Sequence, residues 1–252
     1  MKEAHTYELN KTENIMFTKA TRKGKFIKLA ITGPAGAGKT YSALRLAKGL
    51  TKNGKIALID TENESASLYA TDFDFDVMNV EAPYEINKLV QPVKAALEQG
   101  YDTLVIDSAT HFWNGILEYK TKLDKRGGNS FANWADANVH YDLFLRSILF
   151  SKIHVIVCMR SKMEYVLQEN EKGKAVPQKI GMAPVMRDGV EYEFTTVFDL
   201  DMNHQAQASK DRTNMFGDRI FQITEDTGQL FHHWLNESTE KHQMMYADAA
   251  NG

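Results

Sequence analysis

The sequence of 252 residues contains a single cysteine, Cys158, and five prolines. One cysteine excludes a disulfide framework, which is typical of small secreted domains, and it fits a reducing cytoplasm. No apolar run approaches the roughly 18 residues of a membrane-spanning helix, and residues 1–5 do not resemble a signal peptide. The composition therefore predicts a soluble cytoplasmic protein without a membrane partner.

An excess of charge of one sign is also lacking, because the formal net charge is only −3. Binding to nucleic acid would therefore depend on local basic patches rather than on the overall charge. The chain is long enough for one large α/β domain, and nothing in it requires a second.

Residues 33–40 match the nucleotide-binding pattern G-x-x-x-x-G-K-[ST]. Glycines in such a loop let the backbone N–H groups point inward at phosphate oxygens, the lysine reaches the β- and γ-phosphates, and the threonine hydroxyl coordinates Mg²⁺. A buried strand predicted over residues 26–32 and a helix over 41–50 place the phosphates at a helix N-terminus. The sequence thus predicts a site for ATP and Mg²⁺ made by Gly33, Pro34, Ala35, Gly36, Ala37, Gly38, Lys39, Thr40 and Tyr41.

Two further predicted strands end in acidic residues. The strand 102–108 contains Asp107, a strand-end aspartate of the kind that holds Mg²⁺ together with the P-loop threonine. In many ATPases a catalytic glutamate directly follows that aspartate, but here the place is taken by Ser108. The strand 56–60 leads to Glu62, which is therefore the candidate for orienting a water toward the γ-phosphate, with Asp60 as the next candidate.

The later part of the chain predicts a helical region, a hairpin and more strands. Strands are expected at 75–80, 153–159, 195–200 and 205–209, with a helix at 86–99 that starts or is interrupted near Pro92. Residues 109–150 are helical in period, with a basic loop at 120–128, and residues 165–168 and 175–180 form the arms of a hairpin. The loop, with Phe131 and Trp134, either grips a single-stranded nucleic acid backbone or is a solvated loop followed by core aromatics. Lys172 and Lys174 at the hairpin tip are a second local basic patch.

The chain resembles the RecA-like ATPases over roughly residues 16–235, and in particular the phage-encoded RecA-like proteins of the single-strand annealing (Sak) group. The most specific segments are GPAGAGKT at 33–40, LIDTEN at 58–63 and LVIDS at 104–108. The resemblance implies that Glu62 is the catalytic base. It also implies a homo-oligomer in the bacterial host cytoplasm that acts on single-stranded DNA, with a phage single-strand binding protein as a further partner.

The segment Lys210-Asp211-Arg212 resembles the K-x-R element of DnaB-type helicases and RadA proteins, which reaches the γ-phosphate bound by the adjacent subunit. The resemblance implies catalytic roles for Lys210 and Arg212; the other interpretation is a solvated turn. The chain departs from RecA at Met159, where RecA carries a polar Gln that couples nucleotide to DNA. Either Arg160 or Ser161 substitutes for it, or the coupling is absent.

These observations predict an α/β, three-layer, RecA-like P-loop NTPase fold with a mostly parallel central sheet and a β-hairpin extension. The expected organisation is a polar arm (1–25), an ATPase domain (26–235) and a polar tail (236–252). The expected function is Mg²⁺-dependent ATP hydrolysis coupled to oligomerisation on single-stranded DNA in phage recombination and annealing. The alternatives are a P-loop kinase for a small metabolite and a DNA-binding scaffold for which the nucleotide is only an assembly switch.

Overall fold

The computed structural model describes residues 17–51, 54–127, 129–169 and 175–237. Nine strands lie in this part of the chain: β1 (Lys28–Gly33), β2 (Ile56–Asp60), β3 (Asp76–Asn79), β4 (Thr103–Asp107), β5 (His154–Glu169), β6 (Ala175–Pro184), β7 (Thr196–Leu200), β8 (Ala206–Asp211) and β9 (Ile220–Phe221). The α-helices there are α1 (Lys39–Thr51), α2 (Asn87–Glu98), α3 (Ala109–Lys125), α4 (Ser130–Leu149) and α5 (Glu225–Asn236). Two short 3₁₀ helices, η1 (Ser65–Tyr69) and η2 (Val190–Glu193), complete these elements. None of the helices described combines the length and apolarity needed to cross a membrane.

The central sheet has the strand order β3-β2-β4-β5-β1-β7-β8-β9. The strands from β3 to β7 in this order are all parallel, and β8 and β9 add antiparallel pairs at one edge. The P-loop strand β1 and the Asp107 strand β4 both pair with β5, which lies between them. The carboxyl ends of β1, β2 and β4 therefore lie along one edge of the sheet, next to the part of β5 around Cys158 and Arg160.

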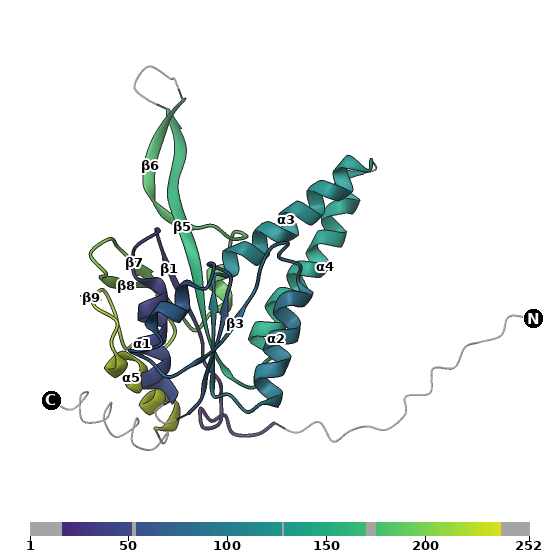
Figure 1. The fold of residues 1–252 in the computed structure, drawn as a ribbon. Coiled ribbons are helices and arrows are strands. Elements are labelled where there is room, and N and C mark those ends of the chain that lie inside the picture. Colours follow the sequence, from purple (N-terminus) through teal and green to yellow (C-terminus); the bar gives the residue numbers. More distant parts are fainter. Residues whose placement is uncertain (1–16, 52–53, 128, 170–174, 238–252) are drawn as a thin grey trace, which may run out of the picture.

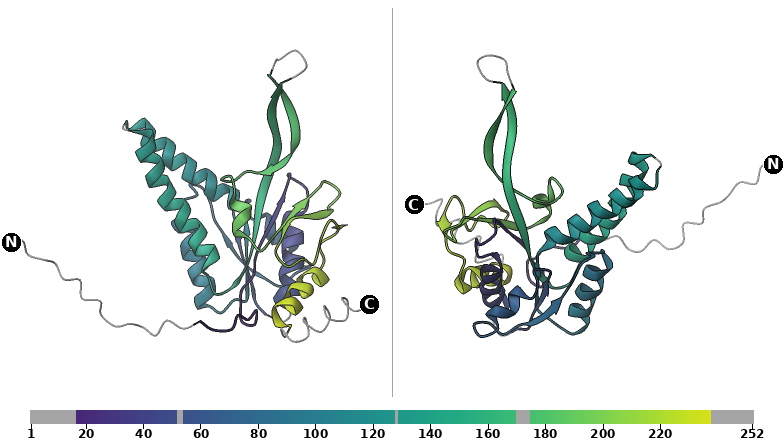
Figure 2. Two further views of the ribbon diagram at one scale, coloured as in Figure 1. Left: turned by 180° about the vertical axis from the view of Figure 1, so that it is seen from behind. Right: turned by 45° about the horizontal axis from the view of Figure 1, so that its top comes forward.

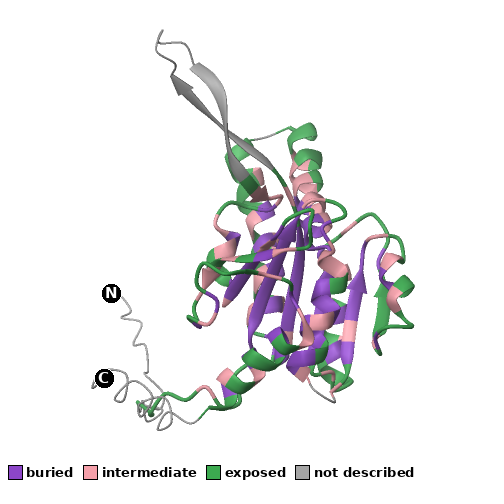
Figure 3. Ribbon diagram, turned by 90° about the vertical axis from the view of Figure 1, so that its left-hand side faces the viewer, coloured by how far each residue is buried: buried purple, intermediate pink, exposed green. Residues whose placement is uncertain are grey.

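Helices cover both faces of the sheet (Figure 1), with α1 and α5 on one face and α2, α3 and α4 on the other. Along β1, Leu29 and Ile31 pack toward α1 and α5, whereas Ala30 packs toward the other helices, as strand alternation requires. The strands in the middle of the sheet are buried almost throughout (Figure 3), as is typical of parallel sheets covered on both faces. The predicted three-layer P-loop NTPase fold with a mostly parallel sheet is confirmed.

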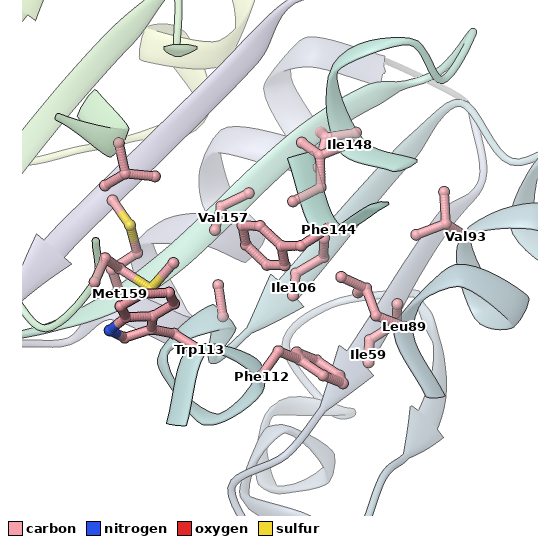
Figure 4. Packing of buried hydrophobic residues seen from close by; sticks show 14 of the residues in the cluster. Ile59, Leu89, Val93, Ile106, Phe112, Trp113, Phe144, Ile148, Val157 and Met159 are labelled. Carbon is pink, nitrogen blue, oxygen red and sulfur yellow. The ribbon is translucent and has the colours of Figure 1, made fainter. Parts of the chain in front are cut away.

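The side of the sheet facing α2, α3 and α4 carries an aromatic core. Phe112 from α3 and Phe144 from α4 are fully buried against Ile106 and Val157 of the sheet (Figure 4). Cys158 is also fully buried, on the opposite face of β5, as the sequence predicts. Its burial raises the pKa of the thiol well above the usual value, so this cysteine remains protonated.

The hairpin extension is longer than the sequence indicates. Strand β5 does not stop after Met159 but continues out of the sheet to Glu169 and pairs antiparallel with β6, beginning at Ser161 opposite Pro184 (Figure 2). The predicted hairpin is therefore confirmed, and Arg160 and Ser161 lie within a strand rather than beyond its end. Lys172 and Lys174 at the tip lie outside the described residues.

Two of the expected element boundaries are wrong. Pro92 neither starts nor interrupts a helix, because α2 runs continuously from Asn87 to Glu98 with Pro92 buried in its interior. The basic segment from Lys120 to Lys125 is not a loop but the last turns of α3, and the connection to α4 is short. Asn129 caps α4, accepting a hydrogen bond from the Phe131 backbone N–H at 2.9 Å. Helices α3 and α4 thus form an antiparallel arm that projects beside the hairpin (Figure 2).

Helix α1, which starts at the P-loop, packs against α5 through two glycines. A Cβ atom at Gly49 would lie 1.8 Å from the Glu225 carbonyl oxygen, and one at Gly228 would lie 2.3 Å from the Leu46 carbonyl oxygen. Only glycine permits this approach of the two backbones. The side chains of Thr224 and Thr227 form a reciprocal capping box at the start of α5. The position of α1 below the P-loop is therefore fixed by close helix packing.

Candidate functional site

The P-loop connects β1 to α1 and forms one wall of a cavity of about 950 Å³. Gly36 and Gly38 have φ values of +82° and +83°, a backbone conformation that favours glycine, and this turns the loop around its centre. The Lys39 ammonium lies across the loop and donates to the carbonyl oxygens of Gly33 at 3.0 Å and Pro34 at 2.8 Å. The residues of the predicted P-loop set that line the cavity are Ala35, Gly36, Gly38, Lys39, Thr40 and Tyr41.

The structure brings the two predicted metal ligands together. The Thr40 hydroxyl donates to Asp107 Oδ2 at 2.5 Å, and both residues line the cavity. Burial raises the pKa of Asp107 to about 6, although the hydrogen bond from Thr40 acts in the opposite direction. Mg²⁺ is usually held by one or two carboxylates together with substrate phosphates and waters, so these hard oxygen atoms fit that ion.

The two carboxylates at the carboxyl end of β2, Asp60 in the strand and Glu62 just after it, have different environments. Asp60 is buried, and its Oδ1 and Oδ2 accept hydrogen bonds from the backbone amides of Glu62 at 2.5 Å and Ala66 at 2.9 Å. Glu62 instead lines the cavity, with a side chain that is 25% exposed. Asp60 therefore holds the turn from β2 into η1, and that turn directs Glu62 toward the space in front of the P-loop.

Glu62 forms an ion pair with Arg160, which lies in β5 at the same edge of the sheet. Arg160 Nε donates to Glu62 Oε1 at 2.9 Å, and a terminal guanidinium nitrogen donates to Oε2. The Arg160 backbone N–H donates to the Thr110 hydroxyl at 3.0 Å, which fixes the strand against α3. The next residue, Ser161, also lines the cavity, and its hydroxyl has no hydrogen-bond partner among the described residues.

A family model described as an AAA domain matches residues 25–238, which is most of the chain. The chain belongs to this AAA domain family. No curated protein matches the chain. Membership agrees with the geometry of the cavity, and together they identify an ATP-binding P-loop ATPase of the AAA type.

This AAA domain has contacts around the cavity that the sequence patterns did not reveal. Tyr41 contacts Tyr69 and Phe73 edge to face, with ring centroids 5.5 and 5.2 Å apart, and Tyr41 and Tyr69 line the cavity. Arg45 also lines it, but its guanidinium binds Glu225 of α5 at 2.8 Å. These residues come from α1, η1 and α5, and no short motif signals that they meet.

A second contact missed by sequence reasoning comes from the loop between β7 and β8. His204 Nδ1 lies 3.1 Å from the Ala37 carbonyl oxygen in the P-loop. A Cβ atom at Gly38 would lie only 3.0 Å from the same nitrogen, so a side chain at position 38 would press on the imidazole. The β7–β8 loop therefore supports the P-loop of this AAA domain from outside the sheet.

The predicted pair Lys210 and Arg212 lies at the end of β8, on one side of the chain. Both side chains donate to the Tyr192 carbonyl oxygen, Lys210 at 2.5 Å and Arg212 at 2.7 Å. Asp211 between them instead accepts hydrogen bonds from Thr196 and Thr213. Neither cation is among the residues that line the cavity of its own chain.

The candidate DNA-binding residues of this AAA domain lie on the α3–α4 arm. Phe131 is 86% exposed and Trp134 is 38% exposed, so neither is a core aromatic. The Lys120 ammonium lies 5.1 Å from the centroid of the Trp134 ring and also pairs with Asp124 at 2.5 Å. The arm thus presents exposed rings beside lysines, although part of the positive charge is already paired.

Proposed function

We propose that the chain is a Mg²⁺-dependent ATPase of the RecA-like kind that assembles on single-stranded DNA during phage recombination and annealing. The observation that carries this proposal is the cavity in which Lys39, Thr40, Asp107 and Glu62 converge, at the carboxyl ends of β1, β4 and β2. Open α/β sheets bind ligands at this edge of the strands. Each residue has a chemical task in the hydrolysis of a terminal phosphate.

In this proposal, the P-loop amides and the N-terminus of α1 hold the phosphates, and Lys39 exchanges its two carbonyl partners for phosphate oxygens. Bound Mg²⁺ neutralises charge on the phosphates, and Thr40 and Asp107 would hold it. Glu62 orients a water for attack on the γ-phosphate. The rings of Tyr41 and Tyr69 offer apolar surface for the nucleobase at the other end of the cavity.

The test is phosphate release from ATP, measured with and without single-stranded DNA and without any small acceptor. Lys39→Ala is the control, because it removes the only P-loop side chain that reaches the terminal phosphates. We expect turnover by the unaltered chain, a rise when DNA is present, and little or no turnover by the variant. Undiminished turnover in Lys39→Ala would refute the assignment of the site.

The α3–α4 arm supports binding to single-stranded nucleic acid. Exposed aromatic rings stack on bases of any sequence, and neighbouring lysines and arginines contact the phosphates. Phe131 and Trp134 supply such rings, and Lys122, Lys125 and Arg126 lie in and after the last turns of α3. The whole chain has a net charge of −3, so binding to a polyanion depends on local groups of cations. The C-terminal end of α3 carries such a group.

The positions of Lys210 and Arg212 support an active site shared between subunits. The two cations lie on the same side of the chain and outside their own cavity, which is where a group acting on the neighbour's γ-phosphate has to lie. Arg212→Ala should then bind ATP but hydrolyse it poorly, since an arginine supplied in trans contributes roughly 10³–10⁵ in rate in GTPases.

A mixing experiment tests the shared site. Lys39→Ala is defective in one half of the site and Arg212→Ala in the other, so mixed assemblies contain some interfaces with both halves intact. We expect ATP hydrolysis to reappear when the two variants are mixed. If it does not reappear although mixed assembly is confirmed, Arg212 does not act on a neighbouring subunit.

A metabolite kinase is the weaker candidate. Such an enzyme needs a lid with several arginines over the phosphates, and only Arg160 and Arg187 have plausible positions in the sequence for this role. Arg187 does not line the cavity; it donates to Asn138 at 3.0 Å and lies over the ring of Tyr141. A scaffold that binds ATP without turnover would differ from our proposal by retaining DNA-dependent assembly without phosphate release.

A further inference from the structure

The ion pair between Arg160 and Glu62 lies in the cavity that the P-loop also lines. In the sheet, Arg160 is in register with Gly33, the first residue of the P-loop, and Cys158 is in register with Asp107. The Arg160 side chain therefore emerges between the P-loop and the Asp107 strand. Both members of the pair line the nucleotide cavity.

Arg160 is the cavity-lining cation whose present partner is easiest to exchange. Arg45 is bound through two nitrogens to Glu225, outside the phosphate region, and Lys39 is part of the P-loop itself. The side chains of Arg160 and Glu62 are 44% and 25% exposed, and a partly exposed ion pair contributes little net stability. Replacing the carboxylate by another anion of similar geometry therefore costs little.

We propose that Arg160 binds the terminal phosphate of a nucleoside triphosphate, which displaces Glu62 from the guanidinium and frees its carboxylate to orient water. This inference rests on the proposed nucleotide binding and adds a residue that distinguishes a triphosphate from a diphosphate. A guanidinium binds phosphate oxygens with the same two-pronged geometry as carboxylate oxygens. A terminal phosphate carries more negative charge than one carboxylate, so it competes effectively for Arg160.

In this proposal, the nucleotide that is bound decides whether Arg160 stays paired with Glu62. With a diphosphate bound, Arg160 stays on Glu62 and both carboxylate oxygens are engaged. With a triphosphate bound, Arg160 turns to the phosphate. Ser161 also lines the cavity, and its buried hydroxyl, which has no partner among the described residues, offers a further donor nearby. The exchange takes place at the root of the hairpin, because β5 begins to pair with β6 at Ser161.

The experiment compares dissociation constants for Mg·ADP and for the magnesium complex of AMP-PNP, the non-hydrolysable imido analogue of ATP, by calorimetry. For Arg160→Ala we expect AMP-PNP to bind about 10- to 100-fold more weakly, as for loss of hydrogen bonds to a charged group, with ADP affinity unchanged. Arg160→Lys keeps the charge but loses the two-pronged geometry, so we expect a smaller loss in the same direction. Arg45→Ala is the matched control: it removes a guanidinium from the same cavity and should leave the ratio of the two affinities unchanged.

Three results are decisive. An unchanged AMP-PNP to ADP affinity ratio in Arg160→Ala would overturn the inference and leave Arg160 as a residue that only holds Glu62. If thermal melting shows that Arg160→Ala is not folded, the same ratio is measured for Arg160→Lys. An unchanged ratio in Arg160→Lys would also overturn the inference. If the unaltered chain binds neither nucleotide, the proposed function itself fails, which the binding data distinguish from a failure of Arg160 alone.

Discussion

Glu62 and Asp60, at the carboxyl end of β2, allow a test of which carboxylate acts in hydrolysis. Glu62 lines the cavity, whereas Asp60 accepts hydrogen bonds from the backbone. Glu62→Gln keeps the size of the side chain and one oxygen that accepts from Arg160, but it removes the basic group. Loss of a general base typically lowers the turnover number by about 10²–10⁴-fold. The Arg160 pair is partly exposed and so contributes at most about 1 kcal/mol to stability. We therefore expect a large loss of turnover with nearly unchanged melting temperature.

Asp60→Asn is the matched variant, and we expect it to lower the stability of the fold, unlike Glu62→Gln. Both carboxylate oxygens of Asp60 accept backbone N–H groups, so the amide nitrogen of Asn must face a donor, leaving a buried polar group unsatisfied. That costs about 1–3 kcal/mol. For a chain of this size each kcal/mol lowers the melting temperature by roughly 2–4 °C. We expect a drop of several degrees, with any loss of turnover following from the displaced turn.

The assays are steady-state phosphate release and thermal melting, both at a temperature where the two variants are folded. Wild-type turnover in Glu62→Gln would refute the reasoning. If Asp60→Asn were then inactive but as stable as the unaltered chain, Asp60 would be the group that acts on water.

Three other predictions follow from the packing, the buried histidine and the helical arm. Gly228→Ala should destabilise the fold strongly, since its Cβ atom would meet the Leu46 carbonyl oxygen; denaturant unfolding measures this, and near-native stability would contradict it. Burial lowers the pKa of His154 from 6.5 to about 4, so the unfolded chain binds protons there that the folded chain does not, and stability falls as pH is lowered through 6.5 toward 4. Between pH 7 and pH 5 the contribution of His154 to this loss should be about 2 kcal/mol by linkage. In His154→Asn the change in stability between the two pH values, measured by urea titrations, should differ from that of the unaltered chain by about this amount. Replacing Lys125 and Arg126 by Ala should reduce the slope of log affinity for single-stranded DNA against log salt by about 0.7 per lost phosphate contact, and an unaltered slope would show that they do not contact it.

The parts of the site that could be predicted are those encoded by short contiguous segments. The P-loop needs glycines, a lysine and a hydroxyl at fixed spacing between a strand and a helix, and all of these lie within residues 26–50. Asp107 ends one buried strand and Glu62 follows another, so their location at one edge follows from the parallel sheet alone. The structure places the predicted metal ligands Thr40 and Asp107 in direct contact.

The errors have local physical reasons. Charge and the following glycines predict a loop at residues 120–125, yet Lys and Leu favour helix, and the amphipathic α3 continues through them. Pro92 lies in the second turn of α2, where it removes one backbone hydrogen bond, while Leu89, Pro92, Val93 and Ala96 bury that face of the helix. Tertiary packing thus outweighs both local signals.

The contact between Arg160 and Glu62 could not be predicted for a different reason. The two residues are 98 positions apart, and their meeting depends on β5 lying between β1 and β4. Local sequence does not determine strand order, whereas it does indicate which segments are strands. Once the strand order is known, the position of Arg160 follows. A side chain on β5 just beyond Cys158 lies between the P-loop, which follows β1 on one side, and Asp107, which ends β4 on the other. Any cation at that position is flanked by the phosphate-binding loop and by the acidic residues that would hold the metal ion and the water. The strand order therefore makes position 160, rather than the late Lys-Asp-Arg segment, the place from which we propose that a subunit's own arginine reaches its own nucleotide.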